Sequence, residues 1–262
     1  MTLKNVETPK VDGLRVSVVV PALNEEKNLR AAVESVIEGA EAAGNVTIEI
    51  LIVDDGSTDG TASLIEEIMA KYSFVRAIHH SRNQGFGACF LSGLEAASYE
   101  WITLFPGDNC ISVPTLTNML KNCGKADVVC AYTVNTECRS RVRNVLSAIF
   151  SFIYTTTFNL HLRYINATPV YSVSQLRNEE LRCFRYSFPS ETTVRLLRKG
   201  CTFMEIQGFM NPGARKSSAL RIRNLAEVVF NYVLLIYDIY LRRRQAYAHA
   251  PVRVLPDGVK FH

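Results

Sequence analysis

The segment "EILIVDDGSTDGT", residues 49–61, joins a large apolar run to a cluster of acidic residues. Residues 50–53 have the composition of a buried strand, and Asp54 and Asp55 follow them without a spacer. A tight turn explains residues 56–58, because glycine permits the bend and hydroxyl groups cap the next helix. It does not explain two adjacent carboxylates at the end of a buried strand, where like charges repel each other. We therefore expect Asp54 and Asp55 to serve a ligand.

Strand-like and helix-like segments alternate on both sides of this stretch, from residue 15 to residue 132. Apolar runs such as "RVSVVVP" and "WITLFP" are separated by segments with helical apolar spacing, such as "EEKNLRAAVESVIEGAEAA". This alternation predicts an α/β fold with a mostly parallel sheet and helices on both faces. In such sheets ligands bind beyond the carboxyl ends of the strands. That rule predicts one site formed by residues 21–25, 54–59, 82–87 and 106–109.

The composition is that of a globular protein with one large core. The chain has 262 residues, of which 48% are hydrophobic and 21% charged. Its seven cysteines include no CxxC pair, which indicates free thiols in a reducing compartment and hence a cytoplasmic protein. The first fifteen residues, "MTLKNVETPKVDGLR", contain no apolar core, so no signal peptide is expected.

The charge is distributed unevenly along the chain. Residues 1–138 hold 10 Lys and Arg against 18 Asp and Glu, a balance of −8, whereas residues 139–262 hold 19 against 7, a balance of +12. The basic second half predicts an anionic partner, although arginines on solvated helices are the simpler alternative. No nucleic-acid-binding motif is present, so we expect no nucleic acid partner.

Two common nucleotide-binding loops are absent from the sequence. "NQGFGACF" contains Gly85 and Gly87 but lacks the third glycine of GxGxxG, and it follows the third strand instead of the first. No GxxxxGK[ST] segment occurs. These observations exclude a dinucleotide oxidoreductase and a P-loop phosphotransferase.

The remaining candidates follow the first two strands. In "VVVPALNEEKNL", Pro21 ends the strand, Asn24 is placed to cap the next helix, and Glu25 lies near the helix N-terminus, where a carboxylate is favoured. In "LIVDDGSTDGT", Asp54 and Asp55 can accept hydrogen bonds from a ribose hydroxyl and a base N–H, and charge-assisted bonds of this kind are strong.

Together with "RNQGFGA", these two segments closely resemble the inverting family-two glycosyltransferases of the GT-A fold. Within that family the chain is most similar to the branch of dolichyl-phosphate mannosyltransferases and polyprenyl-phosphate glucosyltransferases, over roughly residues 15–220. The resemblance implies that the nucleotide contacts residues of four loops, with Asp54 on the base or ribose and Asp55 supporting that corner. The implied nucleotide-binding residues are Pro21, Leu23, Glu25, Asp54, Asp55, Arg82, Gly85 and Asp108.

The family's metal-binding D-x-D motif is only half present. In "FPGDNC", Pro106 stands in place of the first aspartate, Asp108 keeps the second, and Cys110 replaces a polar residue. A divalent Mg²⁺ or Mn²⁺ ion can be held by one carboxylate together with substrate phosphates, so the resemblance still implies a metal on Asp108. The alternative is a Pro-Gly-Asp-Asn turn without a ligand.

Two later segments resemble further parts of the same branch. "YSFPSETTVRLLRKG" places Glu191 near the reacting sugar, as a catalytic residue together with Asp108. "NPGARKSS" places Arg215 and Lys216 over the phosphates, where cations stabilise a departing diphosphate. Glu191 as an ordinary first-turn helix residue is the alternative. The acceptor-side segment, "NATPVYSVS", departs from the family pattern and leaves the acceptor open.

Two apolar runs in the second half, the second of them broken by Asn231 and Asp238, predict contact with a membrane surface. Residues 145–160 follow Arg139, Arg141 and Arg143, and residues 228–241 precede three consecutive arginines at 242–244. Neither run fits a bilayer-spanning helix of about 20 apolar residues. Interfacial helices flanked by arginines are expected instead, with helices buried at a homo-oligomer interface as the alternative.

These observations predict a tail at residues 1–14, a GT-A glycosyltransferase domain at 15–220, and a C-terminal amphipathic helix and tail at 221–262. The predicted reaction transfers a sugar, with inversion, from a nucleotide-diphosphate sugar to a polyprenyl phosphate, and the resemblance favours UDP over GDP. Transfer to a hydroxyl acceptor and a non-catalytic sugar-nucleotide-binding protein are the two alternatives. The protein is expected in the cytoplasm, on the cytoplasmic face of a membrane.

Overall fold

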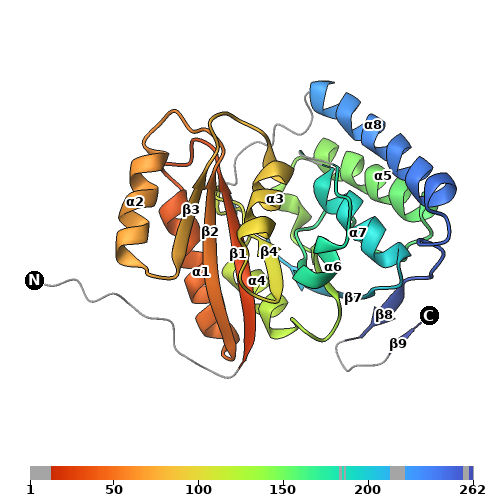
Figure 1. Cartoon of the computed structure of the whole chain (residues 1–262), viewed down its shortest axis with the longest axis horizontal. Coiled ribbons are helices and arrows are strands. Elements are labelled where there is room, and N and C mark those ends of the chain that lie inside the picture. Colours follow the sequence, from red (N-terminus) through yellow and green to blue (C-terminus); the bar gives the residue numbers. More distant parts are fainter. Residues whose placement is uncertain (1–12, 183–184, 186, 213–221, 256–259, 262) are drawn as a thin grey trace, which may run out of the picture.

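The computed structural model describes residues 13–182, 185, 187–212, 222–255 and 260–261. Its first half alternates strands and helices as the sequence predicts (Figure 1). The elements of this half are β1 (Leu14–Ala22), α1 (Leu29–Ala43), β2 (Val46–Asp54), α2 (Thr61–Lys71), β3 (Val75–His79), α3 (Phe86–Ala96), β4 (Trp101–Leu104), α4 (Val113–Lys121) and β5 (Val128–Thr133).

The second half is richer in helices and contributes the other edge of the sheet. Its elements are a short 3₁₀ turn (Thr136–Cys138), α5 (Arg141–Thr157), β6 (Val170–Ser172), α6 (Val173–Arg177), α7 (Phe188–Arg198), β7 (Thr202–Gly208), α8 (Ile222–Tyr237), a π-helical turn (Asp238–Arg242), β8 (Val252–Val254) and β9 (Lys260–Phe261). The apolar runs noted in the sequence thus fall on α5 and on α8 with the π-helical turn that follows it.

The described strands form one sheet in the order β3-β2-β1-β4-β6-β5-β7-β8-β9. β1 pairs in parallel with β2 and β4, β2 with β3, and β5 with β7, whereas β6 is antiparallel to both of its neighbours. The register sets Ala22 opposite Asp54, and Asp54 opposite His79. The loops that follow the first three strands therefore begin side by side at one edge.

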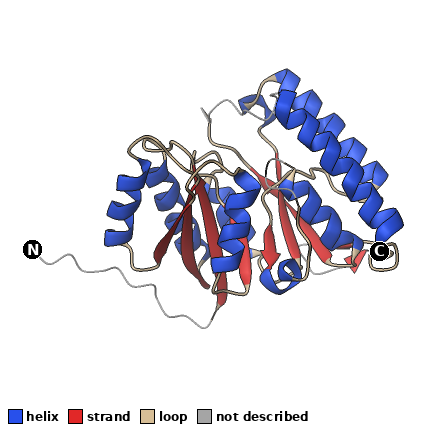
Figure 2. Cartoon of the chain, turned by 45° about the horizontal axis from the view of Figure 1, so that its top comes forward, coloured by secondary structure: helices blue, strands red, loops and turns tan. Residues whose placement is uncertain are grey.

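Helices cover both faces of the sheet, which explains why its central strands are continuous apolar runs (Figure 2). One core packs α1, α2 and α4 against the sheet, and the other packs α3, α5, α7 and α8 against the opposite face. Val18 and Val20 of β1 point into the first core and Val19 into the second, and all three are fully buried. The predicted parallel α/β architecture is confirmed.

The segment after residue 220 is joined to the rest of the chain. β8 pairs with β7 in the same sheet, and Tyr247 and Asp238 are buried, at 0% and 1% exposure. The predicted division into three parts stays a prediction, but its C-terminal part contributes a strand and buried side chains to the core.

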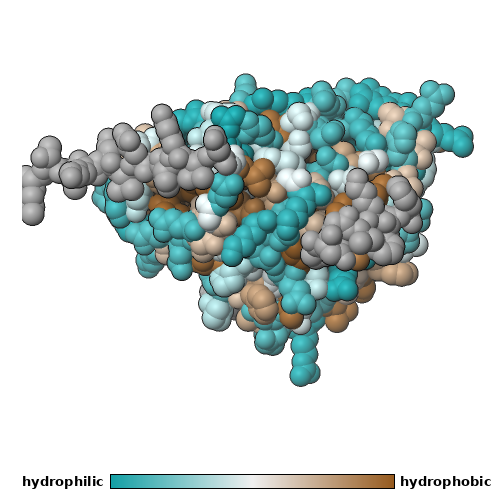
Figure 3. All heavy atoms as spheres, turned by 90° about the horizontal axis from the view of Figure 1, so that it is seen from below, coloured by the Kyte–Doolittle hydropathy of each residue, from teal (hydrophilic) through white to brown (hydrophobic). Residues whose placement is uncertain are grey.

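The amino ends of β1 and β2 lie at the edge of the sheet opposite the loops predicted to bind the ligand. Figure 1 shows β1 entering at the bottom and running upward, so the carboxyl ends of β1 and β2 lie at the top. The face seen from below carries many hydrophilic side chains, with apolar ones showing between them (Figure 3).

None of the helices in the described part of the chain has the length and apolarity that a bilayer crossing requires.

Candidate active site

The loop that carries Asp108 is attached to the end of the first strand. The Gly107 N–H donates to the Pro21 carbonyl at 3.0 Å, and a Cβ on Gly107 would lie 2.6 Å from that oxygen. Only glycine permits this approach, because real Cβ atoms do not come so close to backbone oxygen. The loops after β1 and β4 are thus joined, and Asp108 is held beside Pro21 as the sequence predicts.

Hydrogen bonds also join the loops after β1 and β2. Asp54 Oδ1 accepts from the Ser57 N–H at 2.9 Å, and the Ser57 hydroxyl accepts from the Asn24 N–H at 3.0 Å. The Asn24 side-chain oxygen accepts from the Thr58 N–H at 2.8 Å. The expectation that Asn24 caps the next helix is therefore wrong: its φ is 56°, its side chain is used by Thr58, and α1 begins only at Leu29. Leu23 and Glu25 flank this contact.

Asp55 fixes the loop after β3. Its carboxylate accepts from the Gln84 and Gly85 N–H groups at 2.8 and 2.9 Å, and His80 Nδ1 lies 2.8 Å from Oδ1. Gly56 completes the contact, because its φ is +75° and a Cβ there would lie 2.8 Å from the backbone of Arg82. The second carboxylate thus holds the Arg82–Gly85 loop in place, while the first lies beside the residues that the sequence assigns to the nucleotide.

We predict that Gly56→Ala destabilises the protein more than Gly44→Ala does. Both glycines have positive φ, a backbone conformation that strains alanine at either position. Gly44 has open space around it, whereas Gly56 meets the Arg82 backbone, so overpacking adds about 1–3 kcal/mol. Urea unfolding followed by the fluorescence of the single tryptophan, Trp101, measures the difference. Equal losses for the two variants would contradict the close contact of the loops.

His79 is a candidate that the sequence analysis missed. Its Nδ1 lies 3.2 Å from Asp54 Oδ2, and its side chain is 45% exposed at the edge of the site. "VRAIHH" was interpreted only as a strand, yet its last residues lie at the same sheet edge as Asp54. The position of the two histidines at a strand end was the signal that could have identified His79.

Asp108 and Asn109 together have the chemistry of a divalent-cation site. Asp108 is half-buried, and its Oδ1 accepts from the Cys110 N–H at 3.1 Å. The adjacent Asn109 Oδ1 is buried without a hydrogen-bond partner among the described residues. Carboxylate and amide oxygens are ligands that hard divalent cations prefer. The residues present therefore fit a metal, with Asn109 as a ligand that the sequence analysis did not identify.

Two arginines near the beginning of α5, Arg139 before it and Arg143 in its first turn, interact with residues around this loop. The Arg139 Nε–H donates to Met210 Sδ at 2.9 Å, and Met210 forms a β-bridge with Ile111. Burial lowers the pKa of the Arg143 guanidinium, and the charge of Arg139 lowers it further, against the opposing charge of Asp108. Of the three arginines expected at a membrane surface, these two are partly buried near Asp108, and Arg141 is the exposed one.

A second group of metal-ligating side chains lies beneath the site. Ligand atoms of Asp55, His80 and Cys89 are all within 4.8 Å of one another. Burial and the charge of Asp55 raise the pKa of the Cys89 thiol well above its usual range, which opposes the thiolate that a metal requires. His80 Nε2 also lies 2.9 Å from the Ser92 hydroxyl. This cluster is satisfied by hydrogen bonds and supports the loop.

Glu191 lies in a buried ionic network on α7. Its carboxylate accepts from the Arg182 N–H at 3.1 Å and from Arg195 Nε at 2.9 Å. Arg195 also donates to Asp238 at 2.8 Å and to the Tyr247 hydroxyl at 3.1 Å. These contacts join α7 to the π-helical turn after α8, and they differ from the loop contacts that surround Asp108. The catalytic role of Glu191 stays a prediction.

Arg215 and Lys216, assigned to the phosphates by the sequence, lie outside the described residues. The other predicted nucleotide-binding residues lie on the four loops at one sheet edge. They lie in or after the last residues of β1 (Pro21, Leu23, Glu25) and β2 (Asp54, Asp55), and after β3 (Arg82, Gly85) and β4 (Asp108).

The sheet order and the acidic loops at its carboxyl edge define a GT-A type fold, and comparisons with known proteins agree. The structure is similar to that of glucosyl-3-phosphoglycerate synthase from Mycobacterium tuberculosis, with a TM-score of 0.59 over 86% of this chain and 79% of that chain. That protein was solved with Mn²⁺, UDP-glucose and phosphoglyceric acid. At 19% identity this likeness shows the fold alone. The model of the family "Glycosyl transferase family 2" matches residues 17–182. The chain belongs to that family.

Two curated relatives each match slightly less than half of the chain. A dolichyl-phosphate beta-glucosyltransferase of Trichomonas vaginalis is 33% identical over 138 residues, which are 48% of this chain and 42% of that protein. A cholesterol galactosyltransferase of Borreliella burgdorferi is 32% identical over 123 residues, which are 45% of this chain and 32% of that protein. The chain thus spans less than half the length of these relatives.

Proposed function

We propose that the protein is a glycosyltransferase that uses a nucleotide-diphosphate sugar. The observation that carries this proposal is the convergence of Glu25, Asp54 and Asp108 at one sheet edge in a chain of glycosyl transferase family 2. Loops that only reverse the chain direction would not need these three carboxylates. A nucleotide-diphosphate sugar would use them, because a ribose and a base donate hydrogen bonds to carboxylates and a metal ion on the diphosphate is held by carboxylate oxygens. The UDP-glucose bound by the structural neighbour supports UDP as the nucleotide.

Asp54 is placed to accept hydrogen bonds from the nucleoside. One of its oxygens already holds the Ser57 N–H, and a carboxylate has about four lone-pair sites, so acceptor capacity remains. His79 beside it can donate from its ring. Arg82 and Gly85, held by Asp55, form the far wall of the nucleoside pocket in this proposal.

Asp108 and Asn109 would hold a divalent cation between the protein and the diphosphate. Such a cation, when bound, neutralises charge on the leaving diphosphate. Arg139 and Arg143 add fixed positive charge on the same side of the loop, and Arg215 and Lys216 are proposed to act from the segment that follows β7. Mn²⁺ in the structural neighbour supports a divalent metal in a protein of this fold.

The proposed chemistry is in-line attack at C1 of the sugar, with inversion. A phosphate acceptor carries an ionised oxygen near pH 7 and therefore needs little help from a base. The contacts of Glu191 support such an acceptor, because its carboxylate already accepts hydrogen bonds from Arg182 and Arg195 inside the protein. The dolichyl-phosphate relative supports a polyprenyl phosphate, and the cholesterol galactosyltransferase supports a lipid hydroxyl as second candidate.

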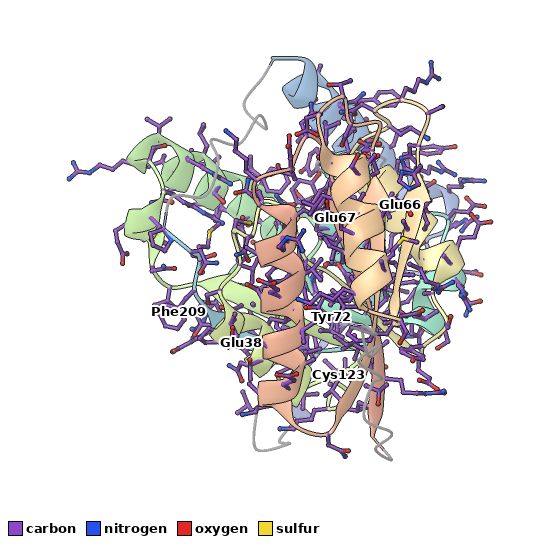
Figure 4. The ribbon with its side chains drawn as sticks, turned by 90° about the vertical axis from the view of Figure 1, so that its left-hand side faces the viewer. Glu38, Glu66, Glu67, Tyr72, Cys123 and Phe209 are labelled. Carbon is purple, nitrogen blue, oxygen red and sulfur yellow. The ribbon has the colours of Figure 1, made fainter. Side chains whose placement is uncertain are left out.

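Asp54→Ala tests the nucleotide site. Removing a charge-assisted partner costs about 1–3 kcal/mol, so we expect UDP and UDP-glucose to bind about tenfold to a hundredfold more weakly. Isothermal titration calorimetry measures this change. Glu66→Ala is the matched control, because Glu66 is an exposed acid on the outer side of α2 (Figure 4). Unchanged affinity in Asp54→Ala would contradict the assignment, and tighter binding of GDP would contradict UDP.

Slow hydrolysis of UDP-glucose separates an enzyme from a binding protein. We expect the purified protein to release UDP and glucose, because water can replace the acceptor in an active site of this kind. Binding of UDP-glucose with neither hydrolysis nor transfer to dolichyl phosphate or cholesterol would instead support the non-catalytic alternative.

A further inference from the structure

α5 carries an apolar stripe that faces away from the core. Six of its large apolar side chains are at least 43% exposed, and they recur at steps of three and four residues: Val142, Val145, Leu146, Ile149, Phe152 and Ile153. Phe152 reaches 69%. A helix normally turns such a stripe toward a core, so one turned outward marks an interaction site.

α8 extends this stripe into a broad face. Its exposed large apolar residues, Val229, Phe230, Val233 and Tyr237, also recur at helical spacing. The two helices lie side by side in both views (Figures 1 and 2). Ring contacts of Tyr154 and Phe158 with Tyr232 join them, with centroids 5.0 and 5.9 Å apart. We call these ten exposed residues of the two helices the α5/α8 face.

The charges around this face are of one sign. The sequence has no Asp or Glu between Glu137 and Glu179, which includes all of α5. On α8, Glu227 pairs with Arg185 at 3.5 Å. Arg141 at the beginning of α5 and Arg244 after the π-helical turn are exposed, and neither forms an ion pair with another described residue. Unpaired cations therefore lie at both ends of the apolar face.

We infer that the α5/α8 face docks on a bilayer that contains anionic lipids. Lipid tails cover the apolar side chains of interfacial helices, and anionic headgroups attract the flanking arginines. A second copy of the chain is a less suitable partner than a bilayer. If two copies packed through their α5/α8 faces, the arginines of one copy would meet a face of the other on which the described residues offer no unpaired carboxylate. The described helices cannot cross the bilayer, so the docking is peripheral.

The role that we assign to this docking rests on the proposed function, because it would bring the active site to a lipid acceptor. α5 begins at Arg141, and Arg139 just before it donates to Met210, which forms a β-bridge with Ile111, three residues after Asp108 of the candidate active site. A docked α5 would therefore hold the site beside the headgroup layer, where the phosphate of a polyprenyl phosphate lies. The substrate reaches the site without leaving the membrane.

Vesicle sedimentation tests the docking without any substrate. The probes are vesicles of phosphatidylcholine with phosphatidylglycerol, and vesicles of phosphatidylcholine alone. We expect the protein to pellet with the anionic vesicles at low salt and to be released at high salt. The double variant Phe152→Ser/Phe230→Ser should lower partitioning at least tenfold, because both side chains lose their burial in lipid. Arg141→Ala/Arg244→Ala should lower it by roughly thirtyfold.

Matched controls distinguish docking through this face from non-specific attraction between vesicles and cations elsewhere on the protein, and from nucleotide binding. Arg30→Ala/Lys71→Ala removes two exposed cations from α1 and α2 and should leave partitioning unchanged. UDP binding should be unchanged in all these variants, which shows that they fold. A protein that stays in the supernatant with every vesicle overturns the inference, as does a dimer in solution that Phe152→Ser/Phe230→Ser dissociates. The sedimentation experiment contains no nucleotide and no acceptor. Failure to bind vesicles would therefore not contradict the proposed transfer reaction, and failure of the transfer reaction would not contradict the docking.

Discussion

Arg195→Leu is expected to lower the free energy of unfolding by about 3–5 kcal/mol, because it removes one partner of a buried ionic network. The Arg195 side chain is 1% exposed and binds both Glu191 and Asp238. In the variant both carboxylates stay buried, with Arg182 and Arg242 at 3.4 and 3.5 Å from Asp238 as the remaining cations. Urea unfolding at neutral pH measures the loss.

The matched control is Arg30→Leu. Arg30 pairs with Glu67 across α1 and α2, but these side chains are 44% and 65% exposed, and exposed pairs contribute about 0–1 kcal/mol. A third variant, Arg195→Leu with Glu191→Gln and Asp238→Asn, should recover part of the loss because it removes the uncompensated charges. A loss for Arg195→Leu as small as that for Arg30→Leu would contradict the buried network.

The same network predicts a pH dependence. Burial raises the pKa of Asp238, but the hydrogen bond and charge of Arg195, with Arg182, outweigh it and lower that pKa below its usual value. A lowered folded-state pKa stabilises the protein above the unfolded pKa, near 3.9, and this contribution is lost as the pH falls through the folded pKa. The stability difference between the wild type and Asp238→Asn should therefore be largest near pH 7 and shrink below about pH 4.

The fold was predictable because its signals are local. The apolar runs of β1, β2 and β4 have no polar face, and each is followed by a helical repeat, so a parallel sheet covered on both faces is the expected solution. Asp54 lies at a strand end in the sequence itself, so its place at the ligand edge follows from the topology. The family comparison confirms the fold and family expected from these residues.

The parts that were missed depend on contacts between distant residues. Asp238 reaches Arg195 from 43 residues away, and no pattern around "YVLLIYDIY" indicates that this acid is buried in an ionic network. Arg143 was assigned to a membrane surface because its sequence neighbours are apolar, and nothing in the sequence indicated that it is half-buried and interacts with Arg139 and Asp108. The cap assigned to Asn24 failed because its side-chain oxygen accepts from Thr58, and α1 begins at Leu29, after Asn28, whose side chain forms no capping hydrogen bond.

Asp108→Asn is expected to lower turnover of the sugar nucleotide by about a hundredfold or more, because the metal's charge stabilisation is worth several kcal/mol and each tenfold in rate corresponds to about 1.4 kcal/mol. The proposed cation site has a single carboxylate, since Pro106 stands at the first position of the motif. Asparagine keeps the shape of Asp108 and its bond to the Cys110 N–H but removes the charge. The loss in turnover should be accompanied by weaker Mn²⁺ binding, measured by calorimetry in the presence of UDP.

Two further variants test how the site holds the cation. Asn109→Ala removes the buried amide oxygen and should weaken Mn²⁺ binding by less than Asp108→Asn does, because a neutral ligand is lost. Pro106→Asp restores the second carboxylate and should tighten Mn²⁺ binding about tenfold or more, as expected for an added charge in a partly buried site. Arg139 and Arg143 oppose a free cation beside Asp108, so the wild type should bind Mn²⁺ measurably only when a nucleotide diphosphate is present. Tight Mn²⁺ binding to the protein alone, unchanged in Asp108→Asn, would place the metal elsewhere.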